Sequence, residues 1–392
     1  REAPGRLMSA PLLDGAWQAC WADFLKNKIE TAERRAAPLV ATHLQAALDE
    51  ADATETERDD LSERLITLAD LAHIAGAARA DEAMLGQAIA AYDAHLRLTP
   101  GNRSAMRMRA ESLLRCGRMP EAFAAFDSIY KAALGGIAEE REVEIAPFQL
   151  IHDAECVEDA VRLGADAGAL TMAAAWRELA AQLQSASADG SQGEDEEVAA
   201  APAKAKAADD PAVRRHSVQS MSAAQRALLG RHGEALPLPP VIAELLPPAI
   251  ADSLPMRALR ADIDWAWATG EYATKRAVVI DDILEPNALA ALQAYSRHGA
   301  HFRTLRRGYL GAFPADGTTH PLLLCLATEL ASAAPSIFAT HALALWWIFK
   351  YGEANPAGIG IHADPAAVNI NLWLTDDAAC IEGGGLAIYS HV

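Results

Sequence analysis

His362 and Asp364 stand two residues apart in the segment Gly358–Asp364, which is typical of a β-strand entered through a tight turn. Side chains alternate between the two faces of a strand, so this spacing puts an imidazole and a carboxylate on one face. Such a pair supplies two of the three ligands of a 2-His-1-carboxylate site, which binds Fe(II) and leaves coordination positions open. We therefore expect His362 and Asp364 to bind iron. The alternative is a hydrogen-bonded His–Asp pair at a strand end.

The segment after this pair alternates in polarity from residue 368 to residue 375. One face would carry Val368, Ile370, Leu372 and Leu374, and the other Asn369, Asn371, Trp373 and Thr375. The apolar face suits a core, whereas the polar face with one aromatic suits the interior of a small barrel that holds a polar ligand. A further strand is expected at 385–391, after three consecutive glycines.

Four stretches, VVIDDIL, KYGEANPAGIGIHAD, NINLWLT and GGGLAIY, resemble the Fe(II)/2-oxoglutarate-dependent dioxygenases of the prolyl-hydroxylase-like branch. The resemblance covers about residues 276–392. It implies a double-stranded β-helix (jelly-roll) domain that hydroxylates a carbon atom, with Fe(II) and 2-oxoglutarate as cofactors and ascorbate as an optional further reductant. It places iron on His362 and Asp364, and 2-oxoglutarate against Tyr351, Asn371 and Trp373. The alternative for Tyr351 and Trp373 is ordinary packing.

The end of the chain departs from that family pattern. Similar enzymes take a second histidine from a later strand, and a later basic residue binds the distal carboxylate of 2-oxoglutarate. His391 is the only histidine after Asp364, and it follows the glycine-rich strand directly, where the third ligand is not expected. We therefore expect the missing ligand beyond Val392, and a truncated oxygenase domain that is inactive without that segment.

Residues 14 to 184 have the apolar spacing of helices. Ala88 and Tyr92 recur 34 residues later as Ala122 and Phe126. A 34-residue period with small residues at helix crossings resembles the tetratricopeptide repeat, whose stacked helix pairs commonly bind extended peptides. The alternative is a generic helical bundle.

The chain as a whole is predicted to be an α+β multidomain protein. We expect a repeat-like helical domain at 1–184, a flexible acidic and Ala-rich linker at 185–212, a helical connector at 213–270 and the truncated oxygenase domain at 271–392. Within the last domain, strands are expected at 277–280, 343–351 and 368–375, a strand or turn at 309–311, and helices at about 286–298 and 321–334. Pro147 predicts a connector, with a helix that starts at Asp153 as its cap.

Composition narrows the classes of partner. Lys plus Arg total 34 against 53 Asp plus Glu, so the net charge is −19, which disfavours nucleic acids and anionic lipid surfaces. No apolar run reaches the roughly 18 residues of a membrane span. Five scattered cysteines without a CxxC pair predict reduced thiols and a cytoplasmic location.

Three functions remain open from the sequence. The first is a dioxygenase that hydroxylates a peptide or protein recruited by the helical repeats. The second is a non-catalytic interaction scaffold with a degenerate or truncated oxygenase domain. The third is an oxygenase that tailors a small metabolite, in which the repeats serve only for dimerisation.

Overall fold

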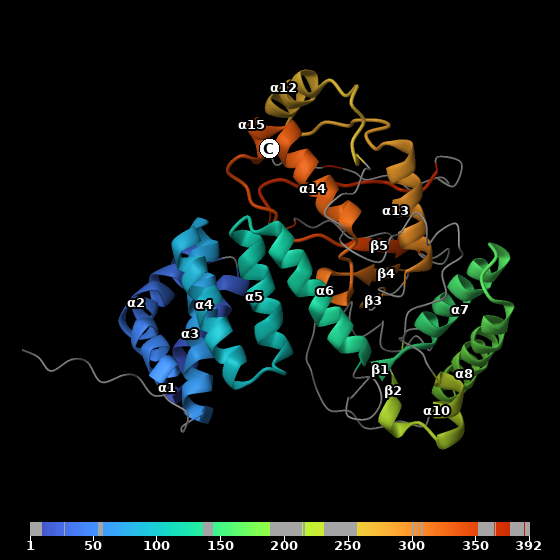
Figure 1. The fold of residues 1–392 in the computed structure, drawn as a ribbon, viewed down its shortest axis with the longest axis horizontal. Coiled ribbons are helices and arrows are strands. Elements are labelled where there is room, and N and C mark those ends of the chain that lie inside the picture. The colour runs from blue at the N-terminus through green and yellow to red at the C-terminus, as the bar shows by residue number, and fades with distance from the viewer. Residues whose placement is uncertain are drawn as a thin grey trace, which may run out of the picture. The chain divides into compact units, whose positions relative to one another are not determined.

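The computed structural model is mostly helical, with few and short strands (Figure 1). It describes residues 10–26, 28–53, 58–135, 144–188, 214, 216–230, 257–299, 302, 304–306, 309–351, 364, 366–376 and 388. Contacts between Cα atoms divide the chain into two compact units. Unit 1 contains Arg1–Arg141, Gly311–Ala327 and Ala334–Phe349, and unit 2 contains Glu142–Leu310, Thr328–Ala333 and Lys350–Val392.

Unit 1 begins with six helices, each packed against the next. They are α1 (Ala10–Leu25), α2 (Ile29–Ala53), α3 (Arg58–Arg79), α4 (Glu82–Leu98), α5 (Arg103–Arg115) and α6 (Met119–Gly135). The side chains of Asp81 and Asn102 cap α4 and α5 by accepting backbone N–H groups. Gly117, with a φ of 73°, forms the turn between α5 and α6. The helical N-terminal region expected from the sequence is confirmed.

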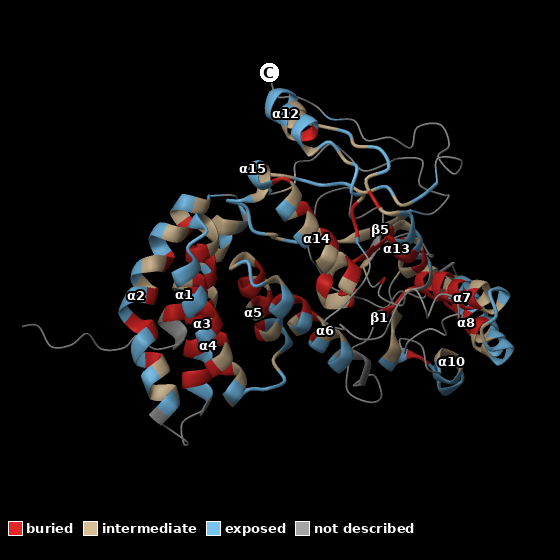
Figure 2. Cartoon of the chain, turned by 45° about the horizontal axis from the view of Figure 1, so that its top comes forward, coloured by how far each residue is buried: buried red, intermediate tan, exposed pale blue. Residues whose placement is uncertain are grey.

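The buried faces of α4 and α6 follow the 34-residue period. Ala88 and Ala122 are completely buried. The aromatic residues four positions later, Tyr92 and Phe126, are at most 2% exposed, and both helices carry a buried face (Figure 2). Small residues let two helices approach, and the aromatic rings fill the remaining space. The membership of a particular repeat family stays a prediction.

Residues from far along the sequence complete the core of unit 1 beside α6. The indole of Trp346 stacks on Phe123 with ring centroids 4.2 Å apart, and meets the edge of Phe126 at 5.7 Å. Trp346 Nε1 also donates a hydrogen bond to the carbonyl oxygen of Thr318, 2.6 Å away. The 3₁₀ helix η3 (Pro314–Asp316) packs on α6 as well, and the short helix α15 (Pro335–Phe338) follows later in the chain.

Unit 2 is built around two packed helices, α7 (Pro147–Arg162) and α8 (Leu170–Ala188), which the 3₁₀ helix η1 (Ala167–Ala169) joins. Its core includes Leu150, Val157 and Trp176. Trp176 Nε1 donates to the carbonyl oxygen of Leu229, at the end of α10 (Ala223–Leu229). The strands β1 (Glu144–Ile145) and β2 (His216–Ser217) pair antiparallel, and the 3₁₀ helix η2 (Val218–Ser220) follows β2.

Three further helices lie in the C-terminal half: α12 (Trp265–Lys275), α13 (Pro286–His298) and α14 (Pro321–Ala333). The last two agree with the helices expected at 286–298 and 321–334. The strands β3 (Thr304–Arg306), β4 (Tyr309–Ala312) and β5 (Ile348–Tyr351) form a sheet in the order β3-β4-β5. The strand expected over 343–351 is therefore limited to its last four residues.

Two expected strands did not form. Residues 277–280 and 368–375 are not in strands, although both sequences have the right composition. A strand exists only through pairing, and neither segment pairs with a strand in the described part of the chain. The jelly roll expected for the C-terminal domain is not seen among the described residues, and most of the strand predicted at 385–391 lies outside them.

None of the helices that the structure describes has both the length and the apolar character that crossing a membrane requires.

Candidate active site

Of the two predicted iron ligands, the structure describes Asp364 but not His362. His362 lies outside the described residues, as does the turn from Gly358 that precedes it. Asp364 is described and half-buried, and its Oδ2 accepts a hydrogen bond of 3.3 Å from Asn369 Nδ2. A carboxylate oriented by a neighbouring amide suits Fe(II) as an oxygen ligand.

The segment after Asp364 keeps much of its expected alternation without being a strand. Val368, Leu372 and Leu374 are half-buried, whereas Asn371 and Trp373 are exposed, Trp373 by 64%. Ile370 breaks the pattern, since 47% of it is exposed. Gln293 of α13 holds the segment in place by donating from Nε2 to the carbonyl oxygen of Leu374 at 2.7 Å. The side chains predicted to contact 2-oxoglutarate from this segment are thus exposed and are not packed into a core.

Tyr351 ends strand β5 and is 56% exposed. Its ring lies against Tyr309 of β4, with centroids 5.7 Å apart. Partial burial, followed by the neighbouring Tyr309 hydroxyl, raises the pKa of Tyr351, so it stays a neutral phenol that can donate a hydrogen bond. Its predicted contact with 2-oxoglutarate stays a prediction.

No set of three or more His, Cys, Asp or Glu side chains in the described part of the chain is arranged to hold a metal ion. Because His362 is outside that part, the predicted iron pair is not tested by this result. The structure therefore neither joins nor separates His362 and Asp364.

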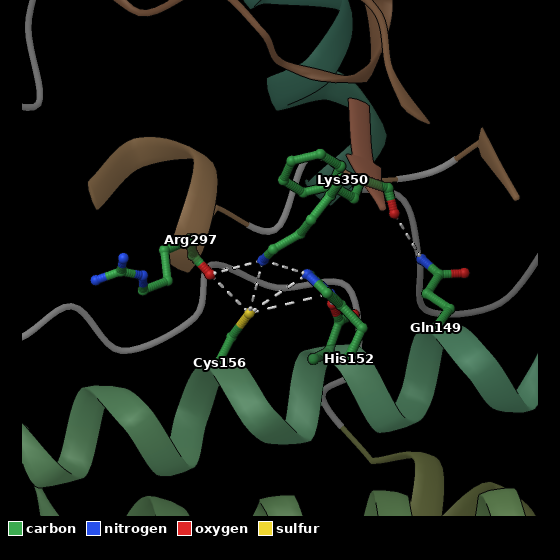
Figure 3. A network of polar contacts seen from close by, with 7 residues as sticks. Gln149, His152, Cys156, Arg297 and Lys350 are labelled. Carbon is green, nitrogen blue, oxygen red and sulfur yellow. Dashed lines mark hydrogen bonds and ion pairs between the residues drawn. The ribbon is translucent and has the colours of Figure 1, made fainter. Parts of the chain in front are cut away.

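A cluster of polar side chains in unit 2 was missed from the sequence (Figure 3). Lys350 of β5 donates from Nζ to His152 Nε2 at 2.7 Å and to the carbonyl oxygen of Arg297 at 3.0 Å. His152 Nδ1 lies 2.8 Å from Asp153 Oδ1, and the Cys156 thiol donates to the same Arg297 carbonyl at 3.0 Å. The cluster thus joins strand β5, the middle of α7 and the end of α13.

Burial dominates the electrostatics of this cluster. It lowers the pKa of Lys350, an effect that Cys156 and Asp153 oppose. Burial also raises the pKa of the Cys156 thiol to about 12, against the opposing influence of Lys350. Cys156 is therefore a thiol at neutral pH and a weak nucleophile.

The sequence interpretation of this region was wrong in one respect. Asp153 does not cap a helix, because α7 begins at Pro147, which occupies the first helical turn. A proline is tolerated there since the N–H it lacks has no helical partner. Asp153 instead lies buried inside the helix beside His152. The sequence holds two parts of this cluster, the His152–Cys156 spacing of one helical turn and a lysine within the aromatic segment of β5, but nothing in it indicates that the two segments meet.

Comparisons with known proteins do not add to these observations. No family model matches the chain, and searches among curated proteins and among solved structures found no match. The resemblance to dioxygenases therefore rests on the sequence segments given above, and any assignment must be argued from the chemistry of the residues.

Proposed function

We propose that this chain belongs to an Fe(II)- and 2-oxoglutarate-dependent dioxygenase with a jelly-roll catalytic domain. The observation that carries the proposal is the His362-x-Asp364 pair followed by the alternating segment 368–375. Supporting it, the Asp364 carboxylate is held by Asn369, and Asn371 and Trp373 are exposed on the same short segment. These residue types fit a site for a hard cation and a polar dicarboxylate.

In this proposal, His362 and Asp364 hold the metal, and Tyr351, Asn371 and Trp373 contact 2-oxoglutarate. When bound, Fe(II) and 2-oxoglutarate would supply the chemistry by which O2, the oxidant, hydroxylates a C–H bond. Asn369 orients the Asp364 carboxylate through its amide hydrogen bond. The Tyr351 phenol offers a donor to a carboxylate oxygen, and the Trp373 indole shields the site from water.

The proposed substrate is a peptide or protein recruited by the helices α1–α6. Stacked helix pairs expose a long surface on which an extended chain can lie. The regular packing of α3, α4, α5 and α6 in sequence order supports this role. The net charge of −19 favours neutral or basic partner segments over acidic ones.

Binding to the native protein tests the metal and co-substrate sites directly. We expect Fe(II) with 2-oxoglutarate to raise the melting temperature of the full-length protein, because a ligand of the folded state stabilises it. His362→Ala and Asp364→Ala should abolish this shift. His341→Ala, which removes an exposed histidine outside the motif, should retain it. A shift that survives in both motif variants would refute the assignment of the ligands.

A non-catalytic interaction scaffold is the second candidate. It is favoured by Ile370, which is 47% exposed although the oxygenase interpretation places it on the face that packs into the core. Candidate peptides distinguish the two functions in the full-length protein. Peptide binding without metal-dependent release of succinate supports the scaffold, whereas succinate release that depends on the peptide supports the enzyme.

A further inference from the structure

Lys350 is surrounded by groups that suit an ammonium ion. Besides the contacts with His152 Nε2 and the Arg297 carbonyl, its Nζ lies 5.2 Å from the centre of the Phe302 ring. An ammonium above an aromatic face gains a cation–π interaction. A partly buried ammonium without such partners would be destabilising, so these contacts offset the cost of burying its charge.

The hydrogen bonds allow one consistent distribution of protons. A lysine ammonium can only donate, so His152 Nε2 must accept from Lys350. The ring proton of neutral His152 then sits on Nδ1 and is donated to Asp153 Oδ1. Asp153, His152 and Lys350 thereby form a chain in which the carboxylate orients the imidazole and the imidazole holds the ammonium (Figure 3).

Lys350 precedes Tyr351 in β5, so the hydrogen bonds that run from Asp153 through His152 to Lys350 also bear on Tyr351. Consecutive residues of a strand point to opposite faces, so Lys350 and Tyr351 lie on opposite sides of β5. Lys350 contacts α7 and the end of α13 on its side, whereas Tyr351 meets Tyr309. Fixing the first side chain therefore fixes the direction in which the second one projects.

We propose that Lys350 is a positioning residue, which ties the end of β5 to α7 through His152 and Asp153 and thereby sets the place of Tyr351 beside the co-substrate. The co-substrate part rests on the function proposed above, whereas the tie itself depends only on contacts within unit 2. Lys350 touches neither the metal nor 2-oxoglutarate in this proposal.

The tie requires His152 Nε2 as an acceptor, because the Lys350 ammonium can only donate. We therefore expect the loss of either partner to release the end of β5.

Three variants of the full-length protein test the tie by hydrogen–deuterium exchange over residues 348–351. Lys350→Met keeps the length of the side chain without its charge, and should speed exchange there by about tenfold or more, because a charged buried hydrogen bond is lost. Lys275→Met, which removes an exposed lysine paired with Glu271 on α12, should leave it unchanged. His152→Gln keeps an acceptor that cannot take up a proton.

Rescue by a conservative change separates positioning from a merely structural role. His152→Leu, a fourth variant, removes the acceptor and should speed exchange over β5 as Lys350→Met does, whereas His152→Gln keeps an acceptor and should stay close to the wild type. Exchange in His152→Leu equal to that of the wild type would overturn the proposal, as would unchanged exchange in Lys350→Met. Should Lys350→Met fail to fold, the comparison of His152→Leu with His152→Gln still decides.

The affinity for 2-oxoglutarate tests the second half of the proposal. Lys350→Met should weaken it by about tenfold, and Lys275→Met should not. A wild type that binds no 2-oxoglutarate refutes the proposed function, yet leaves the tie to be judged by exchange. Normal affinity in a Lys350→Met protein whose β5 exchanges faster would refute the placement of Tyr351 alone.

Discussion

Asp70 on α3 is a partly buried carboxyl group of unit 1. Burial raises its pKa to about 6, although the hydrogen bond donated by the Tyr92 hydroxyl lowers it in part. The group has an ordinary pKa of 3.8 in the unfolded chain. The protonated form therefore contributes stability that is fully present below pH 3.8 and is lost as the pH rises through 6.

Asp70→Asn should stabilise the protein at neutral pH. A shift of about 2 pKa units corresponds to about 3 kcal/mol in the free energy of unfolding, and the neutral amide avoids this cost while still accepting from Tyr92. Urea unfolding at about pH 7.5 should show the gain, and at about pH 3.5 it should disappear. Asp49→Asn, an exposed change on α2, should have little effect at either pH. A gain that is independent of pH would rule out ionisation as its cause.

At the scale of elements, α3 and α4 approach each other closely at Gly76. A Cβ built on Gly76 would lie 2.7 Å from Leu85 Cγ and 2.9 Å from its backbone nitrogen. A Cβ built on Gly86 of α4, by contrast, would have no neighbouring atom within 4 Å. Two glycines in neighbouring helices therefore respond in opposite ways to one added methyl group.

Gly76→Ala should lower the free energy of unfolding by about 1–3 kcal/mol, since backbone atoms must move to admit the methyl group. Gly86→Ala should raise it by about 0.5–1 kcal/mol, because alanine favours an exposed helix position over glycine. Chemical denaturation of the two variants and of the wild type measures both changes in the free energy of unfolding. A stabilising Gly76→Ala would contradict the close crossing.

The elements predicted correctly are those specified by local sequence. Helix α13 starts at Pro286 and α14 at Pro321, where a proline marks the first turn, and both were predicted within a residue or two. Strands depend on partners elsewhere in the chain. Residues 277–280 and 368–375 have a composition typical of strands, but they do not pair with another strand in the described part of the chain. The sequence predicts a later start for α7, because a proline that begins a helix and one that interrupts it look the same in a sequence.

The same limit applies to the candidate sites. The His362-x-Asp364 pair can be predicted because both residues lie within one strand-like segment. The cluster of Lys350 and His152 could not, since 198 residues separate its two main partners. Only the folded chain brings a lysine of β5 to the histidine of α7.

At the scale of the whole molecule, unit 1 is assembled from parts of the chain far apart in sequence. Its first six helices are joined by residues 311–327 and 334–349, which include Trp346 and Thr318. A fragment that ends after α6 would therefore leave the faces of Phe123 and Phe126 uncovered.

Trp346→Ala should destabilise the protein by about 3 kcal/mol, because it removes a large aromatic side chain from between two phenylalanines. Trp346→Phe should cost less, as it keeps the ring and loses the hydrogen bond to Thr318. Trp267→Ala on α12, where the side chain is 49% exposed, serves as the control and should change stability by less than about 0.5 kcal/mol. Equal losses for Trp346→Ala and Trp267→Ala would argue against the packing on α6.

Arrays of stacked helices lengthen during evolution when a gene duplication adds another pair at an open end. The indole that rests on Phe123 already occupies that place at α6, so a newly inserted pair would have to displace it together with η3. Growth of this array is thereby blocked at one end. Relatives with more or fewer helices should differ upstream of α5 and keep an aromatic residue opposite Phe123.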